Sequence, residues 1–155
     1  MQITSILSPE TIRVGVAATD KESVINQAVD LLRGSDKVAD LETVRRVVLE
    51  REREMSTGVG KGLGLPHGKT PSMKGSASSL IVTSDGIDFD AFDDEPVRIV
   101  FLLVGPPESQ SVHIRTLSRI SRLMNDPENR EAVLEADSAE AAYGVIDRAE
   151  KELLR

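Results

Sequence analysis

The sequence predicts a single α/β domain, a three-layer α/β/α sandwich in which a mixed β-sheet is flanked by helices. Helical periodicity at both ends of the chain, buried strand patterns in its middle and turn signals between them predict this class. The 155 residues have the length of one domain, and neither a repeat nor a linker divides residues 1–155. Hydrophobic and charged contents of 39% and 29% are ordinary for a soluble globular protein.

The first third of the chain predicts one strand and two helices. Apolar residues alternate with other residue types over 12–16, which is the period of a short strand. Residues 19–22 have capping-box spacing and open an amphipathic helix, which we expect to end at Gly34. A second helical pattern begins at Asp40 and ends in the charged tract 50–54.

The middle of the chain predicts a loop followed by buried strands. The glycine-rich segment 56–69 has the composition of a loop. Residues 79–83 and 97–104 are apolar runs of strand length. Between them, Asp85-Gly86 predicts a turn into a shorter extended segment over 87–89.

The last third predicts three helices. Pro106-Pro107 breaks the chain, and helical periodicity then runs from Glu108 to Met124. Asp126-Pro127 has the N-cap and N1 pattern of the next helix. Residues 137–140 cap a final helix that reaches Leu154.

Composition excludes several classes of function. A net charge of −7 and a pI of about 4.9 argue against non-specific binding to nucleic acid or anionic membranes. The three arginines of residues 115–122 are therefore interpreted as a solvated helix face. Cysteine is absent, which excludes disulfides, cysteine-bound zinc and thiol chemistry. Residues 1–8 lack a signal-peptide pattern and the longest apolar run, 99–104, is too short to span a bilayer, so we expect a cytoplasmic protein without membrane insertion.

His67 is the first candidate site residue. It follows Pro66, at the end of a run with glycine at every second position over 58–64. An imidazole with an unperturbed pKa of about 6.5 is a nucleophile near neutral pH, and glycines leave backbone N–H groups open to an anion. A loop histidine without a role is the alternative. The stiffness that Pro66 gives and the clustered glycines favour an exposed nucleophilic imidazole.

Two other chemistries fit the sequence poorly. Gly68-Lys69-Thr70 resembles the end of a phosphate-binding loop, but that motif requires glycine where Leu63 stands. The chain has two histidines, no cysteine and no His-Glu-x-x-His pattern, so the sequence gives only weak support for a metal site. We therefore expect neither a nucleotide nor a metal cofactor.

His113 and Arg51 are further candidates that the residues alone leave open. His113 lies in the first turns of a predicted helix, where a surface histidine is the simpler interpretation and an anion-binding one the alternative. Arg51 lies in the alternating charges of 50–54, typical of a solvated helix end. A guanidinium is also the preferred partner of phosphate oxygens, but periodicity does not say which arginine faces a site.

The chain resembles the enzyme IIA domains of the bacterial phosphoenolpyruvate-dependent phosphotransferase system, in the fructose, mannitol and nitrogen-regulatory branch. The resemblance extends from about Ile6 to Leu154. The chain departs from the family pattern at Ile114, where leucine is usual, and we expect no effect because both residues are apolar. The motifs that carry it are Arg51, Ser56-Thr57-Gly58-Val59-Gly60, Leu65-Pro66-His67-Gly68, residues 87–93, Pro96-Val97, residues 100–103, His113-Ile114 and Leu117.

The resemblance implies a role for each candidate residue. His67 corresponds to the phosphorylated histidine, which takes the phosphoryl group on Nε2 while a backbone carbonyl holds Nδ1–H. His113 corresponds to a histidine that stabilises the phosphoryl group, and Arg51 to an arginine that neutralises its charge. Thr57 and Gly68 belong to the surrounding loop. Residues 1–155 would then form a single IIA domain of type 2 that needs no cofactor.

The resemblance also implies the partners. The phosphocarrier protein HPr would donate the phosphoryl group, and an enzyme IIB domain would accept it during uptake of a fructose- or mannitol-type sugar. Alternatively, the phosphorylation state would control a regulated target protein, as in the nitrogen-regulatory branch; the length of the chain, without fused IIB or HPr segments, leans toward this use. A binding module that never accepts phosphate is the remaining hypothesis.

Overall fold

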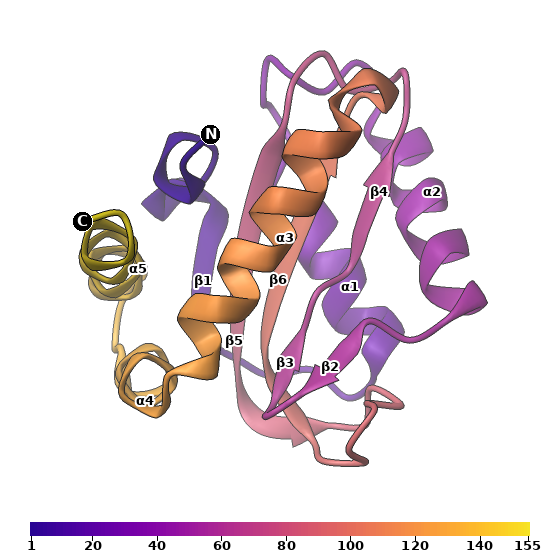
Figure 1. Cartoon of the computed structure of the whole chain (residues 1–155). Coiled ribbons are helices and arrows are strands. Elements are labelled where there is room, and N and C mark those ends of the chain that lie inside the picture. The colour runs from indigo at the N-terminus through magenta and orange to yellow at the C-terminus, as the bar shows by residue number, and fades with distance from the viewer.

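The computed structural model describes all 155 residues and has three layers, as predicted (Figure 1). The first two helices cover one face of a mixed sheet and the last three cover the other. The helices are α1 (Lys21–Asp30), α2 (Leu41–Glu54), α3 (Gln110–Asn125), α4 (Pro127–Glu135) and α5 (Ala139–Leu153). Short 3-10 turns lie at Ile3–Ser5, Pro9–Thr11 and Pro107–Ser109.

The sheet has six strands in the order β1-β5-β6-β3-β2, with β4 also paired to β6. β1 is parallel to β5, β5 is antiparallel to β6, β6 is parallel to both β3 and β4, and β3 is antiparallel to β2. The strands are β1 (Ile12–Val16), β2 (Gly58–Gly60), β3 (Leu63–Gly64), β4 (His67–Lys69), β5 (Ala77–Ile87) and β6 (Val97–Gly105).

The segment 56–69, predicted as a loop, forms three short strands instead. β3 and β4 take successive halves of one edge of β6, with Leu63 opposite Ile99 and His67 opposite Leu103. Glycine at every second position removes the side-chain alternation that marks a strand, and the pairing partner is distant in the sequence. His67 is therefore placed by the sheet.

Two apolar cores hold the layers together. Along β6, Val100, Leu102 and Val104 face the core under α1 and α2, while Ile99 and Phe101 face the core under α3, α4 and α5. Because side chains of a strand point alternately to its two faces, a strand with helices on both sides is apolar at nearly every position. This explains why the sequence of β6 identified it as buried.

Several predicted boundaries differ in detail. The expected turn at Asp85-Gly86 lies within β5, where a register shift between Val82 and Ile87 lets the strand continue. The N-cap of α1 is Asp20, whose side chain accepts from Ser23 N at 2.8 Å, so the predicted capping box at 19–22 is wrong. The predicted helix 108–124 begins with a 3-10 turn. The N-cap Asp126 is confirmed, and within the expected capping segment 137–140 the N-cap is Ser138. No helix has the length and apolar character needed to cross a bilayer.

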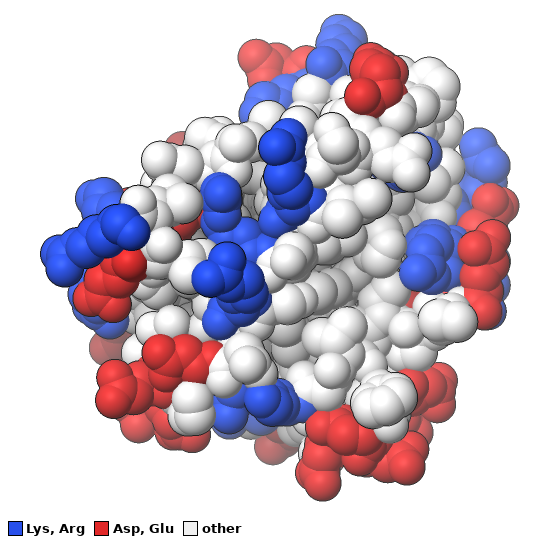
Figure 2. All heavy atoms as spheres, in the orientation of Figure 1, with Lys and Arg blue, Asp and Glu red and all other residues white.

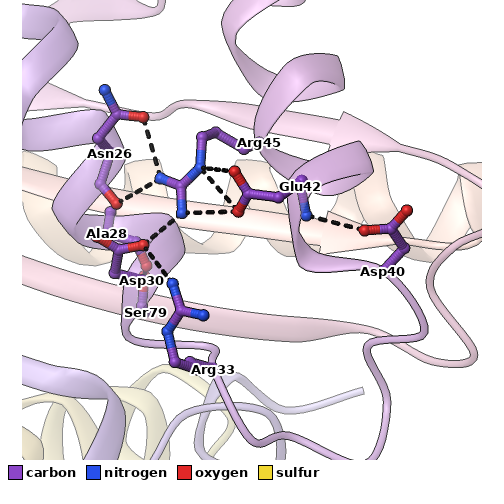
Figure 3. Close-up of polar contacts among 8 residues, drawn as sticks. All are labelled: Asn26, Ala28, Asp30, Arg33, Asp40, Glu42, Arg45 and Ser79. Atoms are coloured by element: carbon purple, nitrogen blue, oxygen red, sulfur yellow. Dashed lines mark hydrogen bonds and ion pairs between the residues drawn. The ribbon is translucent and has the colours of Figure 1, made fainter.

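Arg45 joins α2 to α1 (Figure 3). Its guanidinium donates to the backbone and side-chain oxygens of Asn26 at 3.1 and 3.0 Å and pairs with Asp30 and Glu42. On the other side of α1, Ser79 Oγ donates to the Ala28 carbonyl at 2.7 Å and ties the helix to β5. The C-terminal end of α2, where Arg51 lies, is thus carried by a helix with a fixed position on the sheet.

Gly58 permits a close contact that holds β2 in place. A Cβ built at Gly58 would lie 2.8 Å from both Cα and Cβ of Ala91. The neighbouring Phe92 N–H donates to the Gly58 carbonyl at 2.9 Å. The segment after β5 therefore packs against the backbone of β2.

We predict that Gly58→Ala destabilises the protein by about 1–3 kcal/mol, because the new methyl group overlaps the backbone of Ala91. Gly144→Ala is the matched control, since a Cβ there has nothing within 4 Å and lies inside α5. It should stabilise by up to about 1 kcal/mol through helix propensity. Urea unfolding of both variants measures the difference, and equal stability of Gly58→Ala and wild type would contradict the packing.

Candidate functional site

His67 is the first residue of β4 and is half-buried. Its Nδ1 lies 2.7 Å from the carbonyl oxygen of Leu65. A carbonyl oxygen can only accept a hydrogen bond, so Nδ1 carries the proton and Nε2 keeps a lone pair. A backbone carbonyl at Nδ1 is what the family resemblance implied, and the structure identifies it as that of Leu65. Nε2 is therefore the ring nitrogen with a free lone pair.

His113 lies beside His67 in the interior. Its ring centroid is 5.6 Å from that of His67, and the planes are inclined at 60°. Only 3% of the residue is exposed, so the interpretation as a surface histidine is wrong. The cause is the orientation of α3, which turns His113, Thr116 and Ile120 toward the sheet. Neither ring nitrogen of His113 has a hydrogen-bond partner in the protein, which is rare for buried polar atoms and marks a ligand position.

The surroundings of both imidazoles lower their pKa values and so favour the neutral rings. Burial lowers the pKa of His67; the hydrogen bond to Leu65 raises it, and the positive charges of Arg51 and Lys69 lower it further. Burial also lowers the pKa of His113, to about 4, and the positive charges of a protonated His67 and of Lys69 lower it further. A neutral imidazole can attack phosphorus, whereas an imidazolium cannot. The environment therefore favours the ring form that could act as a nucleophile.

Arg51 lies in the last turn of α2 and is partly exposed. Its Nη1 donates to the Met55 carbonyl at 3.1 Å, which leaves other guanidinium donors for a ligand. Its positive charge lowers the pKa of His67, so Arg51 acts electrostatically on that imidazole. The charged tract 50–54 thus contributes one cation to the site.

Gly68 and Thr57 are both buried, and each contacts α2. A Cβ at Gly68 would lie 3.0 Å from Val47 Cγ1, so glycine lets α2 approach β4 closely. Thr57 is 4% exposed, and its hydroxyl donates to the carboxylate of Glu52. In this structure its side chain is engaged with Glu52.

Lys69 and Glu52 are site residues that the sequence analysis missed. Lys69 lies two residues after His67 on the same strand, so both side chains project to the same side. The interpretation of 56–69 as a loop concealed this. Glu52 follows Val44 and Val48 at helical spacing, on the stripe of α2 that faces the core. A carboxylate on an apolar stripe is the signal that would have found it.

No group of three or more potential metal ligands exists. The largest cavity, of about 590 Å³, lies between the N-terminus of α1 and the C-terminus of α2 and contains neither histidine. The paired imidazoles with nearby cations are therefore the candidate site.

The family model described as "Phosphoenolpyruvate-dependent sugar phosphotransferase system, EIIA 2" matches residues 5–149. A fructose-specific EIIA component from Haloferax volcanii is 34% identical over 144 residues, covering 93% of this chain and 94% of the relative. A fructose-specific EIIABC component from Bacillus subtilis is 33% identical over 97% of this chain, which spans only 24% of that relative. A nitrogen regulatory protein from Bradyrhizobium diazoefficiens is 30% identical, covering 94% of this chain and 95% of the relative.

Solved structures show the same fold. The nitrogen regulatory protein IIA-Ntr from Neisseria meningitidis superposes with a TM-score of 0.87 at 27% identity, covering 93% of this chain and 98% of that one. Enzyme IIA for mannitol from Escherichia coli, determined in complex with phosphorylated enzyme IIB, superposes with a TM-score of 0.79, covering 91% of this chain and 96% of that one. Its 19% identity supports likeness of fold alone.

We predict that the buried His113 makes the protein less stable as the pH falls. Its folded pKa of about 4 lies below the ordinary 6.5, so the unfolded state binds this proton first. The contribution is complete above about pH 6.5 and is lost toward pH 4, on the order of 3 kcal/mol. Urea unfolding of wild type and His113→Phe across this range measures it. Parallel stability curves for the two proteins would contradict the prediction.

Proposed function

The chain belongs to the EIIA 2 family of the phosphoenolpyruvate-dependent sugar phosphotransferase system, and we propose that it relays a phosphoryl group through Nε2 of His67. The donor is an HPr-type phosphocarrier and the acceptor an enzyme IIB domain of a fructose- or mannitol-type uptake system. The hydrogen bond between Nδ1 of His67 and the Leu65 carbonyl carries the proposal, because it leaves Nε2 unprotonated.

The transfer step requires no cofactor. The Nε2 lone pair of His67 attacks the phosphorus of the donor phosphohistidine, and the donor N–P bond breaks with its electron pair passing to the donor nitrogen. His67 then holds the phosphoryl group on Nε2 and keeps the proton on Nδ1. Because this reaction needs little covalent help, positioning and charge neutralisation supply the catalysis.

The residues around His67 supply that neutralisation. His113 has an N–H without a protein partner, and donating it to a phosphoryl oxygen would satisfy a buried polar group. Arg51 and Lys69 supply positive charge, since both already act on His67. Gly68 supports this arrangement from the backbone by allowing α2 to pack on β4.

The surface beside the site suits protein partners. The face that carries α3 and the short strands is uncharged in its middle, with basic groups beside it (Figure 2). Ile114 on α3 and Val59 on β2 are apolar residues that are 57% and 49% exposed. An apolar surface with a basic margin fits docking of a protein that presents an anionic phosphoryl group. Under this proposal the protein acts in the cytoplasm.

Regulation is the second candidate function. The likeness to nitrogen regulatory proteins, 30% identity over nearly full length and a TM-score of 0.87 for IIA-Ntr, favours it. Phosphorylation of His67 would then alter binding to a regulated target protein. Transfer from phosphorylated protein to a IIB domain supports the sugar pathway, whereas stable phosphoprotein that changes affinity for a captured target supports regulation. A binding module without phosphoryl chemistry remains only if no transfer occurs.

We predict that incubation with phosphoenolpyruvate, enzyme I and HPr adds one acid-labile phosphoryl group to wild type and none to His67→Ala. His113→Ala should still accept the group, but about 100-fold more slowly, because one hydrogen bond to the phosphoryl oxygens is lost. Intact-mass spectrometry over time measures both. An unmodified wild type with active HPr would contradict the relay, and a phosphoryl group on His67→Ala would contradict the assignment of the acceptor.

A further inference from the structure

Glu52 is a buried carboxylate of α2 that makes three polar contacts, two with Thr57 and one with Lys21. It is 6% exposed. One carboxylate oxygen accepts from Thr57 N at 2.8 Å and lies 2.7 Å from Lys21 Nζ. The other oxygen accepts from the Thr57 hydroxyl. Burial of an unpaired carboxylate is unfavourable, so these contacts hold Glu52 and Thr57 together.

Lys21 fixes the carboxylate from the opposite side. It is the first residue of α1, and its ammonium lies 4.9 Å from the centre of the Phe89 ring. Phe89 is fully buried, so the cation rests against a rigid part of the core. The exposed Asp90 is 4.0 Å away, at the limit of an ion pair. Glu52 therefore joins α1, α2 and the chain just before β2.

A continuous series of hydrogen bonds leads from Glu52 to the imidazole. The Thr57 carbonyl accepts from Leu65 N at 2.9 Å. The Leu65 carbonyl in turn accepts from Nδ1–H of His67 at 2.7 Å. Between Leu65 and His67 stands Pro66, whose ring restricts the backbone. Thr57 is thus one anchor of the residue whose carbonyl orients His67, beside the pairing of β3 and β4 with β6.

We propose that Glu52, held by Lys21, is a positioning residue: through Thr57 and Leu65 it keeps His67 in the Nδ1–H tautomer with Nε2 directed toward the phosphoryl donor. The proposal rests on the proposed function in that His67 is the phosphoryl acceptor. It gives Thr57 a supporting role, with its side chain directed at Glu52. The negative charge of Glu52 also raises the pKa of His67, opposite in sign to Arg51 and Lys69.

The test compares Glu52→Gln and Thr57→Val with a control on the same helix, Glu54→Gln, whose side chain is exposed. Ring ¹⁵N–¹H correlation spectra of His67 across pH report its tautomer and pKa without any phosphoryl transfer. The rate of phosphorylation by phospho-HPr is the second readout, and thermal unfolding confirms that each variant is folded.

Wild type and Glu54→Gln should show the Nδ1–H tautomer almost exclusively. Glu52→Gln and Thr57→Val should show a mixture of tautomers and a transfer rate up to about 100-fold lower, because a misplaced nucleophile loses the advantage of orientation. Glu52→Gln should also lower the pKa of His67, since a nearby negative charge is removed. Thr57→Ser, which keeps both donors to Glu52, should recover most of the wild-type tautomer and rate.

An unchanged tautomer and rate in folded Thr57→Val or Glu52→Gln would overturn the proposal. If Glu52→Gln does not fold, Thr57→Val decides, because it keeps the Glu52–Lys21 pair. If wild type accepts no phosphoryl group, the proposed function fails, but the ring spectra still test the positioning of His67.

Discussion

The hydrogen bond from Nδ1–H of His67 to the Leu65 carbonyl determines which ring nitrogen can react. A free imidazole exchanges between two tautomers, and only one exposes an unprotonated Nε2. The carbonyl selects that tautomer because it cannot donate a proton. Its own position depends on β3 and β4, which are anchored on β6 before and after the break at Pro66. The strand pairing of the sheet therefore sets the tautomer of His67.

The site meets two electrostatic requirements that oppose each other. A nucleophilic imidazole has to be neutral, while a phosphoryl group needs positive charge and hydrogen-bond donors nearby. Burial and the charge of Lys69 lower the pKa of both histidines, so the cations that would stabilise the phosphoryl group also keep the rings unprotonated. Arg51 acts on His67 in the same way. One set of charges can thus serve the resting and the phosphorylated states.

The sequence predicted those features that depend on local patterns. β6 was identified by its continuous apolar run, and α4 by the Asp126-Pro127 pair, because burial and capping leave direct marks on residue type. β3 and β4 were missed, since their pairing with β6 is long-range and their glycines carry no alternation. The burial of His113 and the role of Lys69 depended on that pairing and on the rotation of α3. His67 was singled out by its own sequence context, whereas His113 and Arg51 received their roles only from the family resemblance. The structure places the His113 ring 5.6 Å from that of His67, and the charge of Arg51 acts on His67.

The most direct test is to phosphorylate uniformly ¹⁵N-labelled protein with phospho-HPr and to identify the phosphorylated nitrogen by NMR. The two ring nitrogens of each histidine are distinguished by their chemical shifts and by coupling to phosphorus. The hydrogen bond to Leu65 predicts a single N–P bond at Nε2 of His67, with the proton retained on Nδ1. A phosphoryl group on Nδ1 of His67, or on either nitrogen of His113, would contradict the central claim.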